Sequence, residues 1–388
     1  MEYESQSLGF KIKKLLRYCR MYGLGRTCIK VRGYRHMRRR FDRLPDSSRT
    51  LGPGQVVGLI GCGNYSFSNI AYYLTMKHGR VIGGCMDVDV HRAASMSRHY
   101  KAPLYTNDAA ELIENEGIRI VFIASNHASH AEYAIQALTH GKDVYIEKPH
   151  VVNGDQLHRL VDAMHRSEGR VYLGFSRPGS RIGRIIRTHL GQEDGPGMYN
   201  WFVAGHVIEP DHWYFHPQEG GRVLGNLCHW TDFLYTVVGT HQFPIRINPA
   251  RAAKSDVDCV VTFTFNDGSI GVISFSAKGH TFEGVKERFS AHKGNCLIAM
   301  DDFWRLTVEV TDRKRRYRSL YRDQGHKNNI ITAFENSTKR LPYDRDELRR
   351  HVANTALLFL KTKEALERNE PIVVAEPYGQ AEPQPKAA

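Results

Sequence analysis

The sequence lacks any apolar run long enough to cross a bilayer, and its cysteines form no recognisable pairs. A transmembrane helix needs roughly 18–20 apolar residues in succession, and no run in this chain reaches that length. The N-terminus is polar and basic, without the apolar core of a signal peptide. The 7 cysteines are odd in number and scattered, with no CxxC pair and no Cys/His ligand spacing, which predicts no metal site. These absences favour a reducing cytoplasm as the compartment.

Acidic residues are scarce at one end of the chain only. The net charge of +13 suggests a nucleic-acid partner until the charge is located. Residues 1–43 carry thirteen lysines and arginines against three acids, a charge of +10, so the rest of the chain carries only +3. The basic character therefore belongs to an N-terminal arm and not to the body. The thirteen bases are Lys11, Lys13, Lys14, Arg17, Arg20, Arg26, Lys30, Arg32, Arg35, Arg38, Arg39, Arg40 and Arg43.

The arm, residues 1–50, contains one amphipathic pattern. Its apolar side chains recur at helical spacing and its bases fall on the other side, which predicts a short helix with a basic face. The run RGYRHMRRRFDRLPDSS (32–48) is typical of an exposed or flexible connector. The apolar positions are Ile12, Leu15, Leu16, Cys19 and Tyr22, and the basic positions are Lys13, Lys14, Arg17 and Arg20.

Residues 51–176 alternate between strand and helix signals. Strands separated by helices of about a dozen residues imply crossover units, and therefore a parallel sheet covered on both faces. A chain of 388 residues with 41% hydrophobic content can hold two or three such globular units. The strand-like runs are 56–63, 81–89, 118–125, 143–149 and 170–176, and the helix-like runs are 67–79, 90–100, 109–117, 130–141 and 154–167.

Beyond residue 176 the strands become longer and the helices group together. We expect a separate α+β domain over 177–375, with a large, open, mostly antiparallel sheet. The NDG sequence at 266–268 predicts a hairpin turn between two apolar-rich runs. Because few helices are available to cover this sheet, we expect its open face to pair with another subunit. Helices are expected at 180–190, 224–238, 326–337 and 345–368, and a disordered tail at 376–388.

The first strand ends in a glycine turn, GCGNYS, that opens a helix. Gly61 and Gly63 would let the backbone approach a pyrophosphate at the helix N-terminus, with Ser66 in place of the third glycine of a GxGxxG motif. The second strand ends in Asp87, which is placed to hydrogen-bond a ribose 2′-hydroxyl and to repel the 2′-phosphate of NADP. This pattern predicts a Rossmann domain that binds NAD in preference to NADP, and the alternative is a sharp glycine turn in some other α/β protein. The predicted cofactor contacts of the loop also include Asn64 and Tyr65.

Two further strands carry polar residues at their carboxyl ends, where ligands of open parallel sheets bind. The stretch VYIEKP (144–149) would place Lys148 beside the nicotinamide half of a dinucleotide. A lysine near a cationic ring loses its proton more easily and can serve as acid or base. The alternative is a solvated ion pair at a strand end. The residues expected to line the cofactor are Ser125, Asn126, His127 and His130 of SNHASH, and Glu147 and Lys148 of EKP.

Taken together, these motifs resemble the Gfo/Idh/MocA family, which includes glucose–fructose oxidoreductase and inositol dehydrogenase. The resemblance lies in GLIGCGN…MDVD…IASNHASHAEYAIQALTHGKDVYIEKP, and it continues through GFSRPGS (174–180), EGGRVLGNLCHWTDFL (219–234), KGNCLIAMDDFWRLTV (293–308) and DQGHKNNI (323–330). It covers about residues 55–370. The resemblance implies an NAD(P)-dependent oxidoreductase of sugars, cyclitols and related carbonyl compounds that forms a homodimer or homotetramer.

The resemblance also implies which residues act on the substrate. It places Lys148 at the active site and His229 opposite it, as the group that exchanges a proton with the substrate hydroxyl. Many members of the family carry Asp four residues before this histidine, where this chain has Gly225, followed by Asn226 as an expected substrate contact. Asp232, one turn after His229, would orient the histidine at the substrate or serve packing. Taken without the resemblance, a histidine on so apolar a helix is more often a core residue.

Three more side chains are expected to face the substrate. The resemblance places the segment DHWYFHPQEGG (211–221) along the substrate pocket, where Trp213 and Tyr214 would stack on a sugar face. Arg177 follows the last strand of the first domain and would pair with a phosphate or carboxylate of the substrate. Each of the three could equally serve domain packing.

The function expected from these features is hydride transfer between NAD and a hydroxyl or carbonyl group of a sugar, polyol or sugar nucleotide. Two alternatives stay open. One is a redox-neutral enzyme that keeps NAD tightly bound and cycles it. The other is a non-catalytic NAD-binding scaffold, which the missing acid at Gly225 favours.

The partner of the basic arm is also left open by the sequence. One alternative is an anionic lipid surface at the inner face of the membrane. A second is an acidic partner protein or the second protomer. Nucleic acid comes third, because no known DNA- or RNA-reading motif accompanies the charge. Against all three stands a helix that packs on its own body with its bases in solvent.

Overall fold

Short, fully buried apolar runs form the first of two sheets in a computed structural model of the protein. The structure describes residues 6–209, 211–239, 242–251, 258–279, 282 and 284–378. Runs such as VGLI, IVFI and DVYI are buried along their whole length, because helices cover both faces of a parallel sheet. The strands are β1 (Val57–Ile60), β2 (Ile82–Met86), β3 (Leu104–Thr106), β4 (Ile120–Ile123), β5 (Asp143–Ile146) and β6 (Val171–Leu173).

All neighbouring strands of this sheet run parallel, in the order β3-β2-β1-β4-β5-β6. The order reverses between β1 and β4, so the loops that follow these two strands open onto one crevice. The predicted Rossmann sheet is confirmed. Its helices are η1 (Ser66–Ala71), which continues into α3 (Tyr72–His78), then α4 (Val90–Tyr100), α5 (Ala109–Ile113), α6 (His127–Thr139) and α7 (Gly154–Arg166).

The second sheet has the order β14-β13-β12-β11-β7-β10-β9-β8-β15 and is antiparallel except where β7 meets β10. Inward and outward residues alternate along its strands, so one face is buried and the other faces solvent. The predicted mostly antiparallel sheet is confirmed. Its strands are β7 (Gly197–Ala204), β8 (Ile245–Arg251), β9 (Asp258–Thr264), β10 (Ile270–Ser276), β11 (Lys286–Lys293), β12 (Cys296–Asp301), β13 (Arg305–Val310), β14 (Arg313–Arg318) and β15 (Ile372–Val374).

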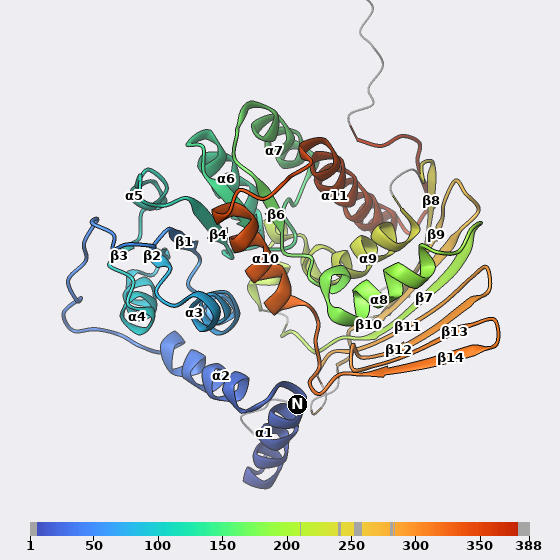
Figure 1. The fold of residues 1–388 in the computed structure, drawn as a ribbon, viewed down its shortest axis with the longest axis horizontal. Coiled ribbons are helices and arrows are strands. Elements are labelled where there is room, and N and C mark those ends of the chain that lie inside the picture. Colours follow the sequence, from blue (N-terminus) through green and yellow to red (C-terminus); the bar gives the residue numbers. More distant parts are fainter. Residues whose placement is uncertain are drawn as a thin grey trace, which may run out of the picture.

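Long helices cover only one face of the second sheet (Figure 1). Apolar residues of α8, α9 and α11 share one core with the inner side chains of this sheet. On the outer face, Met198, Phe202 and Leu297 are about half exposed, at 50%, 53% and 50%. The helical segments of this half are η2 (Arg177–Gly179), α8 (Arg181–Leu190), η3 (Trp213–Phe215), η4 (Pro217–Glu219), η5 (Val223–Leu227), α9 (Cys228–Val238), α10 (His326–Thr338) and α11 (Arg345–Arg368).

The two C-terminal helices hold the two sheets together. Helix α10 places Ile330 and Phe334 in the core beside β1 and β2, and α11 contributes to the cores of both sheets. A division of the chain into domains at 51–176 and 177–375 stays a prediction, since α10 returns to the first sheet before β15 completes the second.

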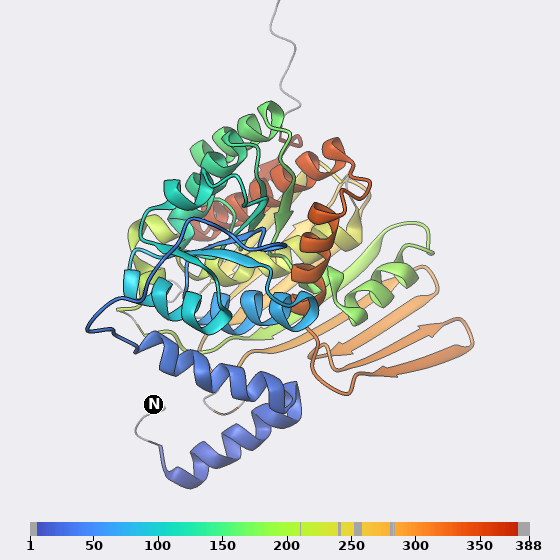
Figure 2. The same cartoon turned by 60° about the vertical axis from the view of Figure 1, so that its left-hand side comes forward.

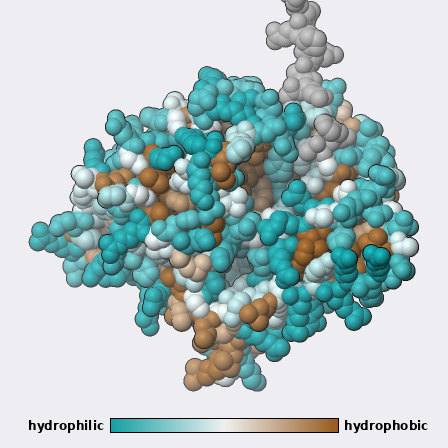
Figure 3. All heavy atoms as spheres, viewed as in Figure 1, coloured by the Kyte–Doolittle hydropathy of each residue, from teal (hydrophilic) through white to brown (hydrophobic). Residues whose placement is uncertain are grey.

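The arm forms two helices, α1 (Leu8–Tyr22) and α2 (Leu24–Met37), joined at Gly23. Gly23 has φ 84°, in the region that favours glycine, and this allows the sharp turn between the helices. Figure 2 shows both helices, in blue, below the first domain, and Figure 3 shows apolar side chains gathered at the same end of the molecule. Helix α2 packs on η1 and α4, whereas Met21 O of α1 accepts a hydrogen bond from Arg322 N in the second half of the chain. The arm therefore contacts both halves.

The prediction of an exposed or flexible connector from residue 32 is wrong in its first part. Residues 32–37 complete α2, where Gly33 and His36 are buried. The physical reason is a tertiary contact that local sequence does not reveal. His36 Nε2 donates to Cys62 O at 2.7 Å, and its ring stacks on Phe67 at 4.4 Å between centroids.

Other expectations can be compared element by element. The NDG hairpin is confirmed, with β9 and β10 antiparallel on either side of it. Four strands were not expected. One, β3, has only three residues, and β14 (RKRRYR) is a charged edge strand without an apolar alternation; the other two are β11 and β15. Most of the tail, 379–388, lies outside the described residues. Within the described part of the chain, no helix is both long and apolar enough to cross a membrane.

Candidate active site

The glycine turn after β1 has the geometry of a dinucleotide-binding loop. Gly61 has φ 85°, and a Cβ at this position would lie 2.4 Å from Ala124 O of the neighbouring strand end. Only glycine therefore lets β1 leave the sheet so close to β4. A Cβ on Gly63, by contrast, would meet nothing within 4 Å. Ser66 Oγ, at the start of η1, is buried without a hydrogen-bond partner. The loop offers an open approach and a spare hydroxyl group, which fits the diphosphate of a dinucleotide.

The arm lies directly behind this loop. His36 holds the carbonyl group of Cys62, and Lys30 Nζ lies 3.5 Å from Asn64 Oδ1. Arg26 donates to Ser68 O and Asn69 Oδ1 in η1. The loop is thus supported from its outer side by α2, which the sequence pattern did not indicate.

Asp87 lies at the end of β2 as expected, but its carboxylate is already engaged. Oδ2 accepts from Cys62 N at 2.8 Å and Oδ1 accepts from Asp89 N at 2.9 Å. Arg92 Nη1 lies 3.6 Å from Oδ1. Asp87 therefore ties β2 to the glycine loop, and a bond to a ribose would have to use the remaining lone pairs of its oxygens. The selection of NAD by this residue stays a prediction.

The side chains of Lys148 and Glu147 in EKP have different partners. Lys148 Nζ donates to Gly225 O at 2.6 Å, across to the second half of the chain. Burial by itself lowers the pKa of Lys148, but Tyr214, Cys228 and Glu147 act in the opposite direction and the pKa ends above its ordinary value. The easier loss of a proton was expected beside a bound nicotinamide ring, so it stays a prediction.

Glu147 is 6% exposed and lies among tyrosines, so it is neither a solvated strand end nor a free cofactor ligand. Tyr145 Oη donates to its Oε1 at 3.1 Å. Burial raises the pKa of Glu147, against the opposing effects of Lys148 and of hydrogen bonds from Tyr65 and Tyr145. Tyr65 in turn lies 3.3 Å from His326 Nδ1 through its hydroxyl oxygen. Glu147 of EKP therefore takes part in a buried hydrogen-bond network beneath Lys148.

Residues of the SNHASH loop hold the site together through the backbone. His130 is buried, with Nδ1 2.8 Å from Pro149 O and Nε2 3.2 Å from Ser125 O, so it joins the ends of β4 and β5. Burial lowers its pKa to about 4. Asn126 and His127 instead reach the second half of the chain. Both ring nitrogens of His130 face carbonyl groups, which leaves neither for a cofactor.

Glu219 is a residue that the sequence reading missed. It is 2% exposed, and its carboxylate accepts from Asn126 Nδ2 at 2.7 Å and from Ala128 N at 3.1 Å, at the N-terminus of α6. An acid at a helix N-terminus is stabilised by the orphan N–H groups there. Glu219 O also accepts from His127 Nδ1 at 2.9 Å. These bonds hold the 211–221 segment at the carboxyl edge of the first sheet. The sequence signal for Glu219 was its position in the EGG stretch of the family motif.

Trp213 and Tyr214 pack on His127 at this edge. Their ring centroids lie 4.7 Å and 4.6 Å from that of His127, and 4.5 Å from each other. The stacking partner that the structure gives them is therefore this histidine. Contact with a sugar face stays a prediction for both.

The glycine at position 225 leaves no space for the family aspartate. A Cβ there would lie 2.6 Å from Tyr214 Cε2 and 2.8 Å from His127 Cε1. The ring of Tyr214 and the imidazole of His127 thus fill the room that a carboxylate would need. Because Gly225 O binds Lys148 as well, the site replaces the missing acid with a carbonyl group and two rings.

This packing gives a testable prediction. Gly225→Ala should lower the free energy of unfolding by about 1–2 kcal/mol, because overpacking outweighs the better helix propensity of alanine. Urea unfolding measures the change. Gly154→Ala is the matched control, since a Cβ at Gly154 meets nothing within 4 Å. In the Tyr214→Ala background the cost of Gly225→Ala should shrink, and an equal cost in both backgrounds would contradict the contact.

His229 lies buried on α9 with Nδ1 unpartnered. Burial lowers its pKa well below the usual value, and the charges of Arg177, Lys148 and His326 lower it further. It is therefore a neutral imidazole with a free nitrogen. Three more buried polar atoms of this region have no partner in the structure. They are Ser176 Oγ, Arg177 Nη1 and Asn226 Oδ1.

Arg177 is not free to bind a substrate anion as a whole. Its Nε donates to Glu287 Oε1, and its guanidinium lies 5.3 Å from the centroid of Trp230. Glu287 is fully buried and also accepts from Trp230 Nε1 at 2.9 Å. The expectation that Arg177 pairs with a substrate phosphate or carboxylate needs correction, because a protein carboxylate already occupies that role and only Nη1 remains.

The buried network around Glu287 is the second feature that the sequence reading missed. Arg322 contacts both Glu287 and Asp302, and its Nη1 donates to Tyr22 Oη of the arm at 2.9 Å. Gln324 also donates to Glu287. Arg322 directly precedes the DQGHKNNI motif (323–330) and Gln324 is its second residue, so the motif was visible but its partner on β11 was not.

The hydrogen bond and the ion pair of the Asp232 carboxylate are made with α11 and not with His229. Its Oδ1 lies 3.2 Å from His351 Nε2 and accepts from Thr355 Oγ1 at 3.1 Å, both on α11. These contacts assign Asp232 to the packing of α9 on α11. Its predicted substrate contact receives no support from them.

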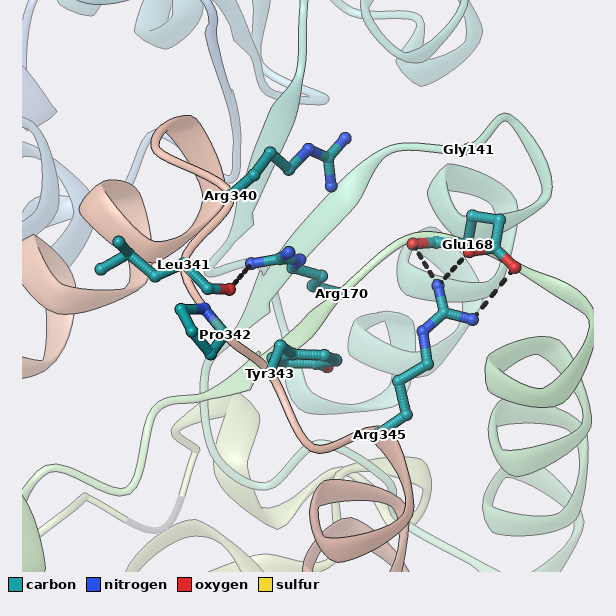
Figure 4. Close-up of a pocket in the computed structure, with 8 residues that line it drawn as sticks. All are labelled: Gly141, Glu168, Arg170, Arg340, Leu341, Pro342, Tyr343 and Arg345. Atoms are coloured by element: carbon teal, nitrogen blue, oxygen red, sulfur yellow. Dashed lines mark hydrogen bonds and ion pairs between the residues drawn. The ribbon is translucent and has the colours of Figure 1, made fainter.

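A pocket lies at the opposite, amino-terminal edge of the first sheet, and its arginines bind groups of the protein itself (Figure 4). Its arginines are all paired. Arg345 binds Glu168, Arg170 donates to Leu341 O at 2.8 Å, and Arg340 Nη1 lies 3.3 Å from Asp143 Oδ1. We therefore place the functional site at the carboxyl edge only.

A parallel sheet in this order with a glycine turn after β1 is the architecture of a dinucleotide-binding domain, and a large, mostly antiparallel sheet follows it. Comparison with known families agrees. Residues 56–175 match the family described as "Oxidoreductase family, NAD-binding Rossmann fold". Residues 56–175 thus match the Gfo/Idh/MocA family, as the motifs of this part of the chain predicted.

Individual relatives fit the same assignment. Oxidoreductase P35 of Formosa agariphila is 34% identical over 122 residues, which cover 31% of this chain and 37% of that protein. An inositol 2-dehydrogenase of Burkholderia multivorans is 30% identical over 147 residues, 37% of this chain and 43% of that protein. These alignments thus span less than half the length of either relative. A levoglucosan dehydrogenase, solved with NADH and levoglucosan, has the same fold, with a TM-score of 0.68 at 16% identity over 82% of this chain and 99% of that one.

Proposed function

We propose that the protein transfers hydride between NAD and a carbinol or carbonyl carbon of a sugar, polyol or sugar nucleotide. One observation carries the proposal. Buried polar atoms without partners lie on Ser176 and Arg177, which follow β6, and on Asn226 and His229, which follow the residue whose carbonyl oxygen binds Lys148, Gly225. Buried polar atoms are rarely left unpaired. A polar ligand rich in hydroxyl groups would supply hydrogen-bond partners for these four atoms. The names of the relatives point to the same class of substrate.

The residues of the glycine loop are those that would hold the dinucleotide. Gly61 and Gly63 would admit its diphosphate, with Ser66 Oγ as a donor, and Asp87 would meet the adenosine ribose. When bound, the nicotinamide supplies the hydride acceptor or donor. We keep NAD ahead of NADP because a carboxylate at this position repels a 2′-phosphate.

The chemistry divides between two side chains. Lys148, with a raised pKa, stays protonated and donates from Nζ to the reacting oxygen. His229, neutral and unpartnered at Nδ1, accepts the hydroxyl proton as the carbon is oxidised and returns it in the reverse direction. Asn226 and Ser176 orient neighbouring hydroxyl groups. The exposed apolar residues on the outer face of the second sheet support a homodimer or homotetramer in this proposal.

The test is a cofactor measurement on the purified protein. The protein is denatured, the released nucleotide is identified by absorbance and mass, and the stripped protein is titrated with NAD and with NADP. Gly63→Trp fills the open space that the diphosphate needs and should weaken NAD binding by about 100-fold or more, in keeping with several lost contacts. Gly154→Trp, an equal change at another open and exposed glycine, should bind NAD normally.

The outcomes separate the alternatives. Exchangeable NAD, with net reduction of free NAD by a sugar or polyol, supports the dehydrogenase. NAD that stays bound in near-stoichiometric amounts without net turnover identifies the redox-neutral alternative. Unchanged NAD affinity in Gly63→Trp, or no binding of either nucleotide to the parent protein, overturns the proposed cofactor site.

A further inference from the structure

Helix α1 turns its apolar side toward solvent. Leu8, Ile12, Leu15 and Leu16 recur at helical spacing along one side and are 73%, 49%, 46% and 62% exposed. The side packed on the protein carries Met21, which is buried. Surface helices ordinarily face the core with their apolar stripe, so this orientation is inverted. An exposed stripe of this kind marks a surface that another body covers.

Helix α2 extends the same surface. Leu24 and Val31 are 74% and 42% exposed, while Ile29 and His36 on the other side of α2 are buried against the first domain. We call α1 and α2 together (Leu8–Met37) the arm hairpin. Figure 3 shows apolar side chains at the end of the molecule where Figure 1 places α1.

The surface is cationic as well as apolar. Residues 6–41 contain twelve lysines and arginines and no aspartate or glutamate. Several of these bases are exposed on the same two helices. A second copy of the chain docked on this stripe would bring two sets of like charges together, which disfavours association. An anionic surface with an apolar interior satisfies both properties at once. The exposed bases include Lys13, Arg20, Arg32, Arg35 and Arg39.

The hairpin is fixed to the body, so it can carry the whole protein. Arg322 binds both Met21 O and Tyr22 Oη at the end of α1, and His36 binds Cys62 O at the end of α2. Neither helix qualifies as a membrane-spanning segment among the described residues. The geometry points to attachment in the plane of the interface.

We propose that the arm hairpin docks this protein peripherally on an anionic lipid surface, with Leu8, Ile12, Leu15 and Leu16 inserted among the headgroups and the bases paired with anionic lipids. Bases near such a surface are attracted to its anionic lipids, and the apolar side chains add the burial of their methylene groups. The inference does not depend on the oxidoreductase proposal, because the exposed apolar side chains take no part in the contacts that α2 makes with the glycine loop.

The test is co-sedimentation of the full-length protein with vesicles. Vesicles of phosphatidylcholine with about 30% phosphatidylglycerol should retain the protein at least 10-fold more strongly than pure phosphatidylcholine, and salt at about 0.5 M should weaken the binding. The double substitution Ile12→Ser with Leu16→Ser should lower binding about 10-fold or more. The control is Met76→Ser with Val373→Ser, which removes two side chains that are 49% and 60% exposed elsewhere, and its binding should equal that of the parent.

Three results would overturn the proposal. The first is equal or absent binding to both kinds of vesicle. The second is equal loss of binding in the Met76/Val373 control. The third is a smaller oligomer for Ile12→Ser with Leu16→Ser in sedimentation equilibrium without vesicles, because the stripe would then be a contact between subunits. The NAD content of each variant, measured in parallel, shows that its first domain is intact.

Discussion

Replacing His229 by alanine is expected to lower kcat by about 10²- to 10⁴-fold, the range that a positioned acid–base group contributes. The reason is the free Nδ1 of a neutral, buried imidazole beside Lys148 and Arg177. The measurement is steady-state NAD reduction with the best substrate of a sugar and polyol panel. NAD affinity should be unchanged, since the bonds of the glycine loop do not involve His229.

A matched control separates chemistry from packing. His150 is also buried, but it lies on the far side of Phe175 and donates from Nε2 to Val352 O at 2.9 Å. His150→Gln keeps a donor for that carbonyl group and should leave kcat near the parent value. Lys148→Ala should lower kcat as His229→Ala does. If both site variants bind NAD and retain full activity, the catalytic assignment is wrong and the scaffold alternative gains.

The catalytic pair also accounts for a departure from the family pattern. Family members with an acid four residues before the histidine would hold a negative charge near Lys148. In this chain Lys148 reaches Gly225 O instead, and the room is filled by Tyr214 and His127. Since a carbonyl group fixes the ammonium without neutralising it, Lys148 would keep its charge for the reacting oxygen in the proposed mechanism. The site is altered, yet both proposed groups remain in place.

Local pattern was sufficient for the first sheet and insufficient for the contacts between its loops. Runs such as IVFI are buried wherever they fall in a parallel sheet, so their periodicity predicts them. Asp87 was correctly placed at the end of β2, but its bond to Cys62 N depends on how two loops meet. The same limit applies to His36, whose burial requires a carbonyl group 26 residues along the chain. Such contacts follow from tertiary structure and not from spacing.

The second half of the site shows the same limit more strongly. His229 and Lys148 were found through motifs, because each motif carries its own residues. The role of Glu219 follows from its bond to Ala128, and that of Glu287 from its bond to Arg177. Both partners lie far away in the sequence. In KERFSAHK, Glu287 alternates onto the inner face with Phe289 and Ala291, where an acid is unexpected, and the opposing arginines stabilise it there as a buried ion. The roles of Glu219 and Glu287 therefore depend on which residues they contact, and the sequence does not show those contacts.

Acid should unfold this protein over a narrow range below about pH 6.5, because several histidines are buried in the neutral form. Burial lowers the pKa of His150 to about 3, of His326 to about 3 and of His130 to about 4, from an ordinary 6.5. The folded state therefore stays unprotonated at these rings while the unfolded chain takes up protons. The stability that they contribute is complete above pH 6.5 and is lost progressively as the pH falls toward the folded-state values.

The size of the effect is large for a marginally stable chain. Each such histidine loses about 1.4 kcal/mol per pH unit, or about 2 kcal/mol between pH 6.5 and 5. Asp302, whose pKa burial raises to about 6, and Glu147 act in the opposite direction, because the folded state takes up their protons first. The net loss for the three histidines is on the order of 5 kcal/mol, comparable to the whole stability of many domains.

Urea unfolding at pH 7.5, 6 and 5 measures this loss, with one variant to assign it. His150→Gln removes a titrating ring while keeping a donor for Val352 O, so it should lose about 2 kcal/mol less than the parent between pH 6.5 and 5. His165→Gln, at an exposed position of α7, should follow the parent. A parent that is equally stable at all three values would contradict the burial of neutral rings. If the parent is acid-labile and His150→Gln is equally so, the loss arises at other buried histidines, among them His130 and His326.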